Sequence, residues 1–158
     1  MPDDASSQPQ NGIAMKQPAL TTTARALLRI VTGFLFAAHG WQKFSEFTIP
    51  GTQAAFAQMG VPAANVAAPV VASLELAGGI ALILGVFTRV FALLLAVDML
   101  GALFLVHAPA GIFVAAGGYE LVLILAAAAL AVALVGAGKV SVDGALFGRA
   151  GSRLSALA

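Results

Sequence analysis

The sequence predicts an all-α protein embedded in a membrane, with four helices that pack antiparallel as a bundle. Composition is the first reason: 60% of the 158 residues are hydrophobic and only 9% are charged, whereas soluble domains average about 25% charged residues. The second reason is a series of four apolar runs, each close to the length that a helix needs to cross a bilayer. Gly and Pro residues separate these runs, where they end helices.

The first expected span covers residues 25–44. As a helix it would extend about 30 Å, the thickness of a hydrocarbon core. Between Ile30 and Ala38 its only polar side chain is that of Thr32, and the span then ends in the polar sequence HGWQK at 39–43. Residues 1–24 are expected to form a disordered cytoplasmic tail, because so polar a segment cannot offset the entropy of ordering it.

Three further spans are expected in the rest of the chain. The segment before the second span is predicted to be either a plain loop or a short surface helix, N-capped by Thr52 and ended by Gly60. The membrane domain covers residues 25–138 and is followed by a cytoplasmic tail at 139–158. The remaining spans are expected at residues 65–86, 90–106 and 117–136.

The distribution of basic residues predicts how the protein sits in the membrane. Of the 8 Lys and Arg residues, Lys43 alone lies on one side of the predicted domain, and the others flank the opposite side. Because positive charge concentrates on the cytoplasmic side, both termini are expected in the cytoplasm. The net charge of +1 offers no basic field for nucleic acid, which is excluded as a partner.

Three stretches in order along the chain carry a family resemblance. They read R-x3-G-x2-F-x2-HG-x2-K at 29–43, E-x2-GG-x5-G-x2-TR at 75–89, and GGYE at 117–120 running on to GAGKVSVD at 136–143. The run DMLGA at 98–102, and His107 with Gly111, add to the pattern. Together they resemble the DoxX family, which implies a four-helix protein of the bacterial cytoplasmic (inner) membrane. Some members of that family act as the quinone-facing subunit of a thiosulfate:quinone oxidoreductase, and others assemble with sulfurtransferase and superoxide dismutase.

The absence of Cys limits the chemistry of the chain on its own. Without Cys there can be no disulfide, thiol relay or thiolate-bound iron–sulfur cluster. Any electron transfer would therefore need a bound cofactor or a partner subunit. No metal site is expected either, because di-iron helical bundles use Glu-x-x-His pairs and the sequence contains none.

Ionisable residues fall within or at the end of every predicted span, at comparable depths. Because a charge at the bilayer centre costs about 2.5–3.5 kcal/mol, such residues usually face a cavity or a partner. His39 and Lys43 lie four residues apart, so they share one face of a helix. The expected ligand-binding or proton-exchanging residues are His39, Lys43, Glu75, Asp98, Tyr119 and Glu120, with Trp41, Gln42 and His107 as weaker candidates. None of them can be assigned as catalytic from sequence.

Each candidate also has a purely structural interpretation. Lys43 can extend to the membrane interface, and Trp41 can belong to an interfacial belt of aromatic residues. The pair Gly78-Gly79 indicates a close contact between helices. Glu75 and Asp98 fit a structural role least well, since buried carboxylates need a proton or a cationic partner.

Three functions fit these observations. In the first, the protein is an accessory subunit of a membrane oxidoreductase: a quinone binds among His39, Lys43, Glu75 and Glu120, and Glu75 or Asp98 exchanges the protons of quinone reduction. The second is a non-catalytic scaffold or assembly factor, in which the polar network sets helix register. The third is a small solute or proton carrier. Quinone is the candidate cofactor, and the bilayer and proteins of a membrane redox assembly are the expected partners. Homo-oligomerisation and catalysis by the isolated chain are left open.

Overall fold

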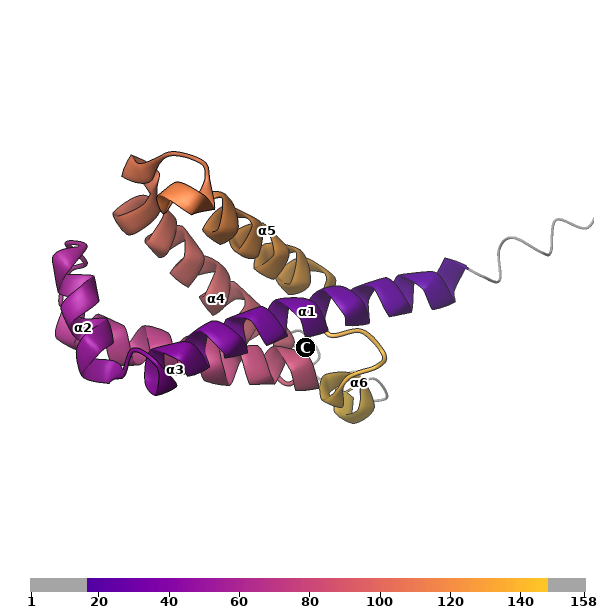
Figure 1. Ribbon diagram of the computed structural model, residues 1–158. Coiled ribbons are helices and arrows are strands. Elements are labelled where there is room, and N and C mark those ends of the chain that lie inside the picture. The colour runs from indigo at the N-terminus through magenta and orange to yellow at the C-terminus, as the bar shows by residue number, and fades with distance from the viewer. Residues whose placement is uncertain (1–16, 148–158) are drawn as a thin grey trace, which may run out of the picture.

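The computed structural model describes residues 17–147, and in this part of the chain every regular element is helical (Figure 1). The α-helices are α1 (Gln17–Ser45), α2 (Ile49–Gln58), α3 (Ala64–Leu84), α4 (Thr88–Ala102), α5 (Glu120–Val135) and α6 (Val142–Phe147). Helix α4 continues into a π-helix, η1 (Leu103–His107), and two short 3₁₀ turns follow, η2 (Ala108–Ala110) and η3 (Val114–Ala116). The predicted all-α class is confirmed.

In the part of the chain that the structure describes, three helical stretches are long and apolar enough to cross a membrane, namely Ala19–Ser45, Ala64–Leu84 and Thr88–Ala110. They correspond to the first three predicted spans. Helix α5 is as apolar but has 16 residues, and at 1.5 Å per residue it extends only about 24 Å. The protein is therefore a membrane protein with at least three apolar helices, and a complete fourth crossing stays a prediction.

Helix α1 begins earlier than predicted. Residues 17–24, which were assigned to the disordered tail, are helical, so that part of the prediction is wrong. These residues carry no charge, and Pro18 lies in the first turn, where its missing N–H costs no helical hydrogen bond. Residues 1–16 and 148–158, which make up most of the two predicted tails, lie outside the described residues.

The predicted surface helix exists as α2, but its N-cap is Thr48 rather than Thr52. The Thr48 hydroxyl accepts a hydrogen bond from the Gly51 N–H at 3.3 Å. Thr52 lies one turn further on, where its hydroxyl contacts the carbonyl oxygens of Thr48 at 2.9 Å and Lys43 at 3.3 Å. The helix is therefore tied to the end of α1.

The helices pack as two pairs, α1 with α3 and α4 with α5, and the pairs meet where α3 contacts α4 (Figure 1). Glycines allow the closest approach, as the sequence predicted for Gly78-Gly79. A Cβ atom on Gly79 would overlap the backbone of Ala37 in α1, and one on Gly40 would overlap the backbone of Leu76 in α3. Gly78 faces the other way, against Leu95 of α4. Gly79 thus lets α3 approach α1, its partner in the first pair, and Gly78 lets it approach α4 of the second pair.

A small apolar core joins the two pairs, and large apolar side chains also cover the outside. Phe36, Leu82, Leu95 and Val132 are fully buried where the pairs meet. Outward-facing side chains include Leu134, which is 80% exposed. Exposed apolar side chains on helices of this length are expected where lipid, not water, is the surrounding solvent.

A cluster of polar contacts closes one end of the helices. The carboxylate of Asp143 in α6 accepts hydrogen bonds at 3.0 Å from the N–H groups of Phe87 and Thr88 and from the Thr88 hydroxyl. These N–H groups belong to the start of α4, where no helical carbonyl is available to accept their hydrogen bonds. Nearby, Arg29 Nη2 of α1 donates to the Val140 carbonyl at 2.7 Å. We call these five residues the Asp143 lock.

Candidate functional site

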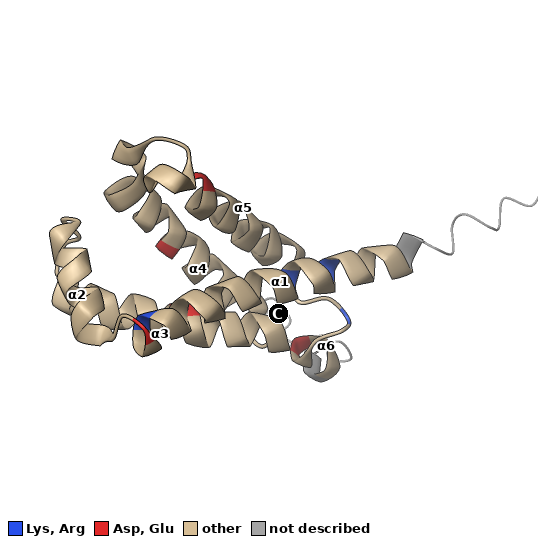
Figure 2. Ribbon diagram, viewed as in Figure 1, with Lys and Arg blue, Asp and Glu red and all other residues tan. Residues whose placement is uncertain are grey.

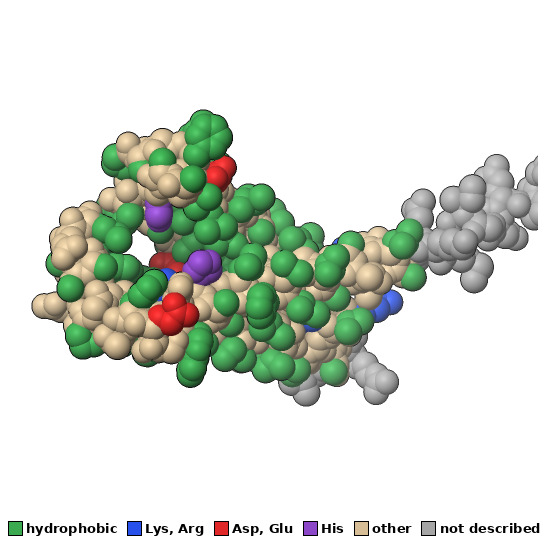
Figure 3. Space-filling model, in the orientation of Figure 1, with side chains coloured by type: hydrophobic (Ala, Val, Ile, Leu, Met, Phe, Trp, Pro, Cys, Tyr) green, Lys and Arg blue, Asp and Glu red, His purple; other side chains and the backbone are tan. Residues whose placement is uncertain are grey.

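A cavity of about 870 Å³ lies at the opposite end of the helices from the Asp143 lock. It opens between the α1–α3 pair and the α4–α5 pair, with α2 along one side, and it shows as a hollow in the surface (Figure 3). Most of its wall is apolar. The larger apolar side chains that line it include Phe36, Phe56, Met59, Met99 and Leu125.

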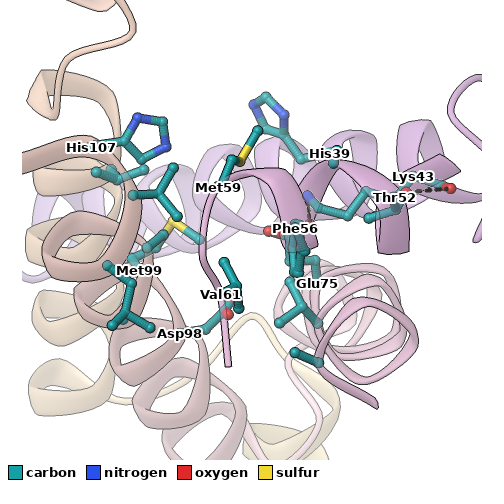
Figure 4. Close-up of a pocket in the computed structure, with 18 of the residues that line it drawn as sticks. His39, Lys43, Thr52, Phe56, Met59, Val61, Glu75, Asp98, Met99 and His107 are labelled. Carbon is teal, nitrogen blue, oxygen red and sulfur yellow. Dashed lines mark hydrogen bonds and ion pairs between the residues drawn. The ribbon is translucent and has the colours of Figure 1, made fainter. Parts of the chain in front are cut away.

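An ion pair between Lys43 and Glu75 forms one polar side of the cavity (Figure 4). Lys43 Nζ of α1 lies 2.5 Å from Glu75 Oε2 of α3. The Glu75 side chain is 4% exposed and that of Lys43 16%. A buried carboxylate needs a proton or a cationic partner. For Glu75 that partner is Lys43.

Asp98 of α4 also lines the cavity, but among the described residues no Lys or Arg forms an ion pair with its carboxyl group. Its Oδ2 atom is buried and has no hydrogen-bond partner in the described part of the chain. The cavity thus contains two carboxyl groups and one Lys ammonium group. With both carboxyl groups ionised it would carry an uncompensated negative charge, which is costly inside a membrane. The arrangement can hold a proton on a carboxyl group or bind a hydrogen-bonding ligand.

The two histidines lie on different walls of the same cavity (Figure 4). His39 lies one helical turn before Lys43 in α1, as its spacing predicted. His107, a weaker candidate in the sequence, lies at the end of η1. Its Nδ1 atom is 2.6 Å from the Gly117 carbonyl oxygen. The structure thereby brings together His39, Lys43, Glu75, Asp98 and His107.

The other four candidates do not line the cavity. Glu120 Oε1 accepts a hydrogen bond from the Val114 N–H at 2.6 Å and so holds the loop before α5. Tyr119 packs against the apolar core. Trp41 is 60% exposed, and Gln42 donates to Glu46 on the outer surface of α1. The predicted binding of a ligand head group beside Glu120 thus has no support in this geometry.

Sequence reasoning missed two features of the site. The apolar residues of the wall were not identified, because Phe36, Phe56 and Met99 look like any other lipid-facing or core residue in so apolar a sequence. The π-helical geometry at the end of α4 was also missed. The only local signal is Pro109 with Gly111, which predicts that the helix ends but not how it ends.

Comparison with known proteins identifies relatives of this chain. The DoxX family model matches residues 24–108. An uncharacterized protein of Haemophilus influenzae is 38% identical over 125 residues, which cover 77% of this chain and 90% of the relative. A Bacillus subtilis protein named "Putative oxidoreductase CatD" is 32% identical over 121 residues, covering 77% of this chain and 85% of the relative. No solved structure matches significantly.

Proposed function

The chain belongs to the DoxX family, and we propose that it is a quinone-facing accessory subunit of an oxidoreductase in the bacterial inner membrane. The observation that carries the proposal is the cavity, with its largely apolar wall and its polar groups Lys43, Glu75 and Asp98. Ligand sites are typically apolar clefts with a few placed polar groups, and a volume of about 870 Å³ is within their usual range.

The chemistry of a quinone matches the two parts of this wall. Its ring and isoprenoid tail are apolar, and the tail keeps it dissolved in the bilayer. It would enter between the helix pairs. Lys43 can donate a hydrogen bond to a quinone oxygen, since an ammonium group carries three N–H donors and Glu75 occupies one of them.

Asp98 and Glu75 are the groups that can exchange protons with the ligand. Reduction of a quinone takes up two electrons and two protons, and carboxyl groups are common general acids and bases. The chain has no Cys, so the electrons would come from a partner subunit. The name of the CatD relative as an oxidoreductase supports this class of assembly.

The basic residues support an orientation for the site. Arg29 belongs to the Asp143 lock, and Arg25, Arg89 and Lys139 lie close in sequence to its members. Figure 2 shows basic residues in α1 and in the segment before α6. By the positive-inside rule the lock faces the cytoplasm. The cavity would then lie in the outer half of the membrane, with both chain termini inside, and α5 would complete the fourth crossing.

The test is quinone content after extraction of the purified protein from its native membrane in a mild detergent. We expect about one quinone per chain, measured by native mass spectrometry and by organic extraction. The double variant Lys43→Met/Glu75→Gln removes the polar side of the cavity without leaving an unpaired charge, and we expect it to retain at least several-fold less quinone. Glu46→Gln is the matched control, because Glu46 is exposed and its carboxylate accepts a hydrogen bond from Gln42 outside the cavity.

Two results would contradict the proposal. One is wild-type protein that contains no quinone and shows no saturable binding of an added short-chain quinone. The other is equal quinone content in the wild type and the double variant. A stoichiometric protein partner in a quinone-free preparation would favour the scaffold hypothesis instead.

A further inference from the structure

The position of His107 depends on an unusual backbone conformation. Residues 103–107 form a π-helix at the end of α4, and single π-helical turns inside α-helices occur frequently at functional sites. The extra residue per turn rotates the chain relative to an α-helix. In this arrangement Leu105, Val106 and His107 all line the cavity. His107 is the polar side chain among them.

A backbone carbonyl determines which nitrogen of His107 carries the proton. The Gly117 carbonyl oxygen can only accept a hydrogen bond, so His107 Nδ1, at 2.6 Å, must be the donor. The neutral ring then has no proton on Nε2, which lies on the other side of the imidazole and presents a lone pair. Figure 4 shows the His107 ring at the edge of the cavity. In the neutral ring a hydrogen-bond acceptor therefore lies at the edge of the cavity.

The carbonyl itself is held by the loop between η2 and α5. The N–H of Gly117 donates to the Val114 carbonyl at 2.9 Å, and the N–H of Gly118 donates to the Phe113 carbonyl at 2.9 Å. The Glu120 carboxylate binds the N–H of Val114 in the same loop. Glu120 is thus a positioning residue: it holds the loop whose Gly117 carbonyl bonds His107, and it does not line the cavity itself. The loop maintains the His107 tautomer, since a different loop conformation would remove the Nδ1 acceptor.

We propose that His107 makes the cavity selective for the reduced, hydroxyl-bearing form of its quinone. The inference rests on the proposed function, and it adds which redox form the site prefers. A quinone carbonyl oxygen only accepts hydrogen bonds, so it would face the Nε2 lone pair without a bond. A quinol hydroxyl can donate to that lone pair. The carboxyl group of Asp98 makes this distinction only when it is ionised, because a protonated carboxyl group can also donate a hydrogen bond to a quinone oxygen.

The test compares the affinities of one short-chain quinol and the corresponding quinone under anaerobic conditions, by titration calorimetry of the protein in lipid nanodiscs. We expect the wild type to bind the quinol about tenfold more tightly, the ratio that corresponds to about 1.4 kcal/mol. His107→Phe keeps a ring of similar size without the acceptor, and its quinol-to-quinone ratio should fall to about one. Glu46→Gln should retain the wild-type ratio. The quinol dimethyl ether, which lacks hydroxyl donors, should bind no better than the quinone.

The possible failures are distinguishable. If the wild type binds neither redox form, the proposed function fails, and this inference fails with it. If both forms bind with equal affinity, or if folded His107→Phe keeps the quinol preference, only the selectivity by His107 is overturned. Circular dichroism and size-exclusion chromatography establish that the variant is folded. A change in the ratio of two affinities would not follow from general destabilisation.

Discussion

Both ends of this helical protein bury acidic side chains, but the two ends satisfy them differently. At the Asp143 lock, one carboxylate accepts three hydrogen bonds from the start of α4. At the cavity, Glu75 has one ionic partner, and Asp98 Oδ2 has no hydrogen-bond partner in the part of the chain that the structure describes. Buried polar groups are nearly always hydrogen-bonded, so an exception needs an explanation.

The difference indicates separate roles for the two ends. The contacts of the lock join residues 55 to 111 positions apart in the chain, and so hold α1, the turn between α3 and α4, and α6 together. Within residues 17–147, Arg29 also has two buried nitrogen atoms without hydrogen-bond partners. It packs so closely against Gly85 that a Cβ there would collide with its Nη1 atom, which leaves no room for a ligand. Asp98, whose Oδ2 atom has no hydrogen-bond partner among the described residues, instead borders a cavity.

The largest expected effect on stability is at the lock. Asp143→Ala removes all three hydrogen bonds and leaves the buried N–H of Thr88 and its hydroxyl without an acceptor. An unsatisfied buried group costs about 1–3 kcal/mol, so we expect a loss of about 3–5 kcal/mol. Thermal unfolding in detergent, followed by circular dichroism, would measure this loss. Asp143→Asn retains one acceptor oxygen and should lose less.

The lock assignment would be wrong if Asp143→Ala unfolded at the wild-type temperature. It would also be wrong if a variant that was less stable, but still folded at the assay temperature, lost quinone binding while Lys43→Met/Glu75→Gln retained it. Either result would remove the distinction between a structural end and a ligand-binding end.

A smaller effect is expected for the ion pair in the cavity. Glu75→Gln leaves Lys43 without its carboxylate, and removing one partner of a buried pair typically costs about 3–5 kcal/mol. Because the Lys43 side chain is 16% exposed, solvent or headgroup contact reduces the penalty, and we expect about 2 kcal/mol. The double variant Lys43→Met/Glu75→Gln should recover most of that loss. A double-mutant cycle on unfolding free energies measures the coupling, and additive effects of the two substitutions would show that the pair does not interact.

The fold class and the first three apolar helices could be predicted from sequence, because long apolar runs indicate membrane-spanning helices and glycine pairs indicate close helix contacts. The Gly78-Gly79 contact follows from the same logic, since only a missing side chain permits that approach to α1 and α4. The start of α1 could not be predicted. Polar residues such as Thr21 and Thr22 are compatible with both a tail and a helix, and the choice depends on helix continuity from the apolar part.

The site was predicted in part, for a similar reason. His39, Lys43, Glu75 and Asp98 stand out because ionisable groups are rare in apolar spans. His107 and Glu120 both lie near helix ends, where polar residues are common, so sequence alone could not separate one that lines the cavity from one that binds a loop N–H. That distinction depends on how the π-helix and the loop between η2 and α5 orient the two side chains.

The smallest effect on stability is expected for Asp98→Asn. This substitution is also the clearest test of whether the lock is structural and the cavity binds a ligand. Asp98 Oδ2 has no described partner to lose, and a neutral amide is less costly than a carboxylate inside a membrane. We therefore expect an unfolding free energy within about 0.5 kcal/mol of the wild type, or slightly higher. Quinone binding and proton exchange should nevertheless decline, because an amide cannot take up and release a proton at neutral pH. Such a variant, as stable as the wild type but deficient in quinone turnover, would identify Asp98 as a residue retained for function. A loss of stability comparable to that of Asp143→Ala would instead mean that both carboxyl groups are structural, and that the cavity is only a packing defect between two helix pairs.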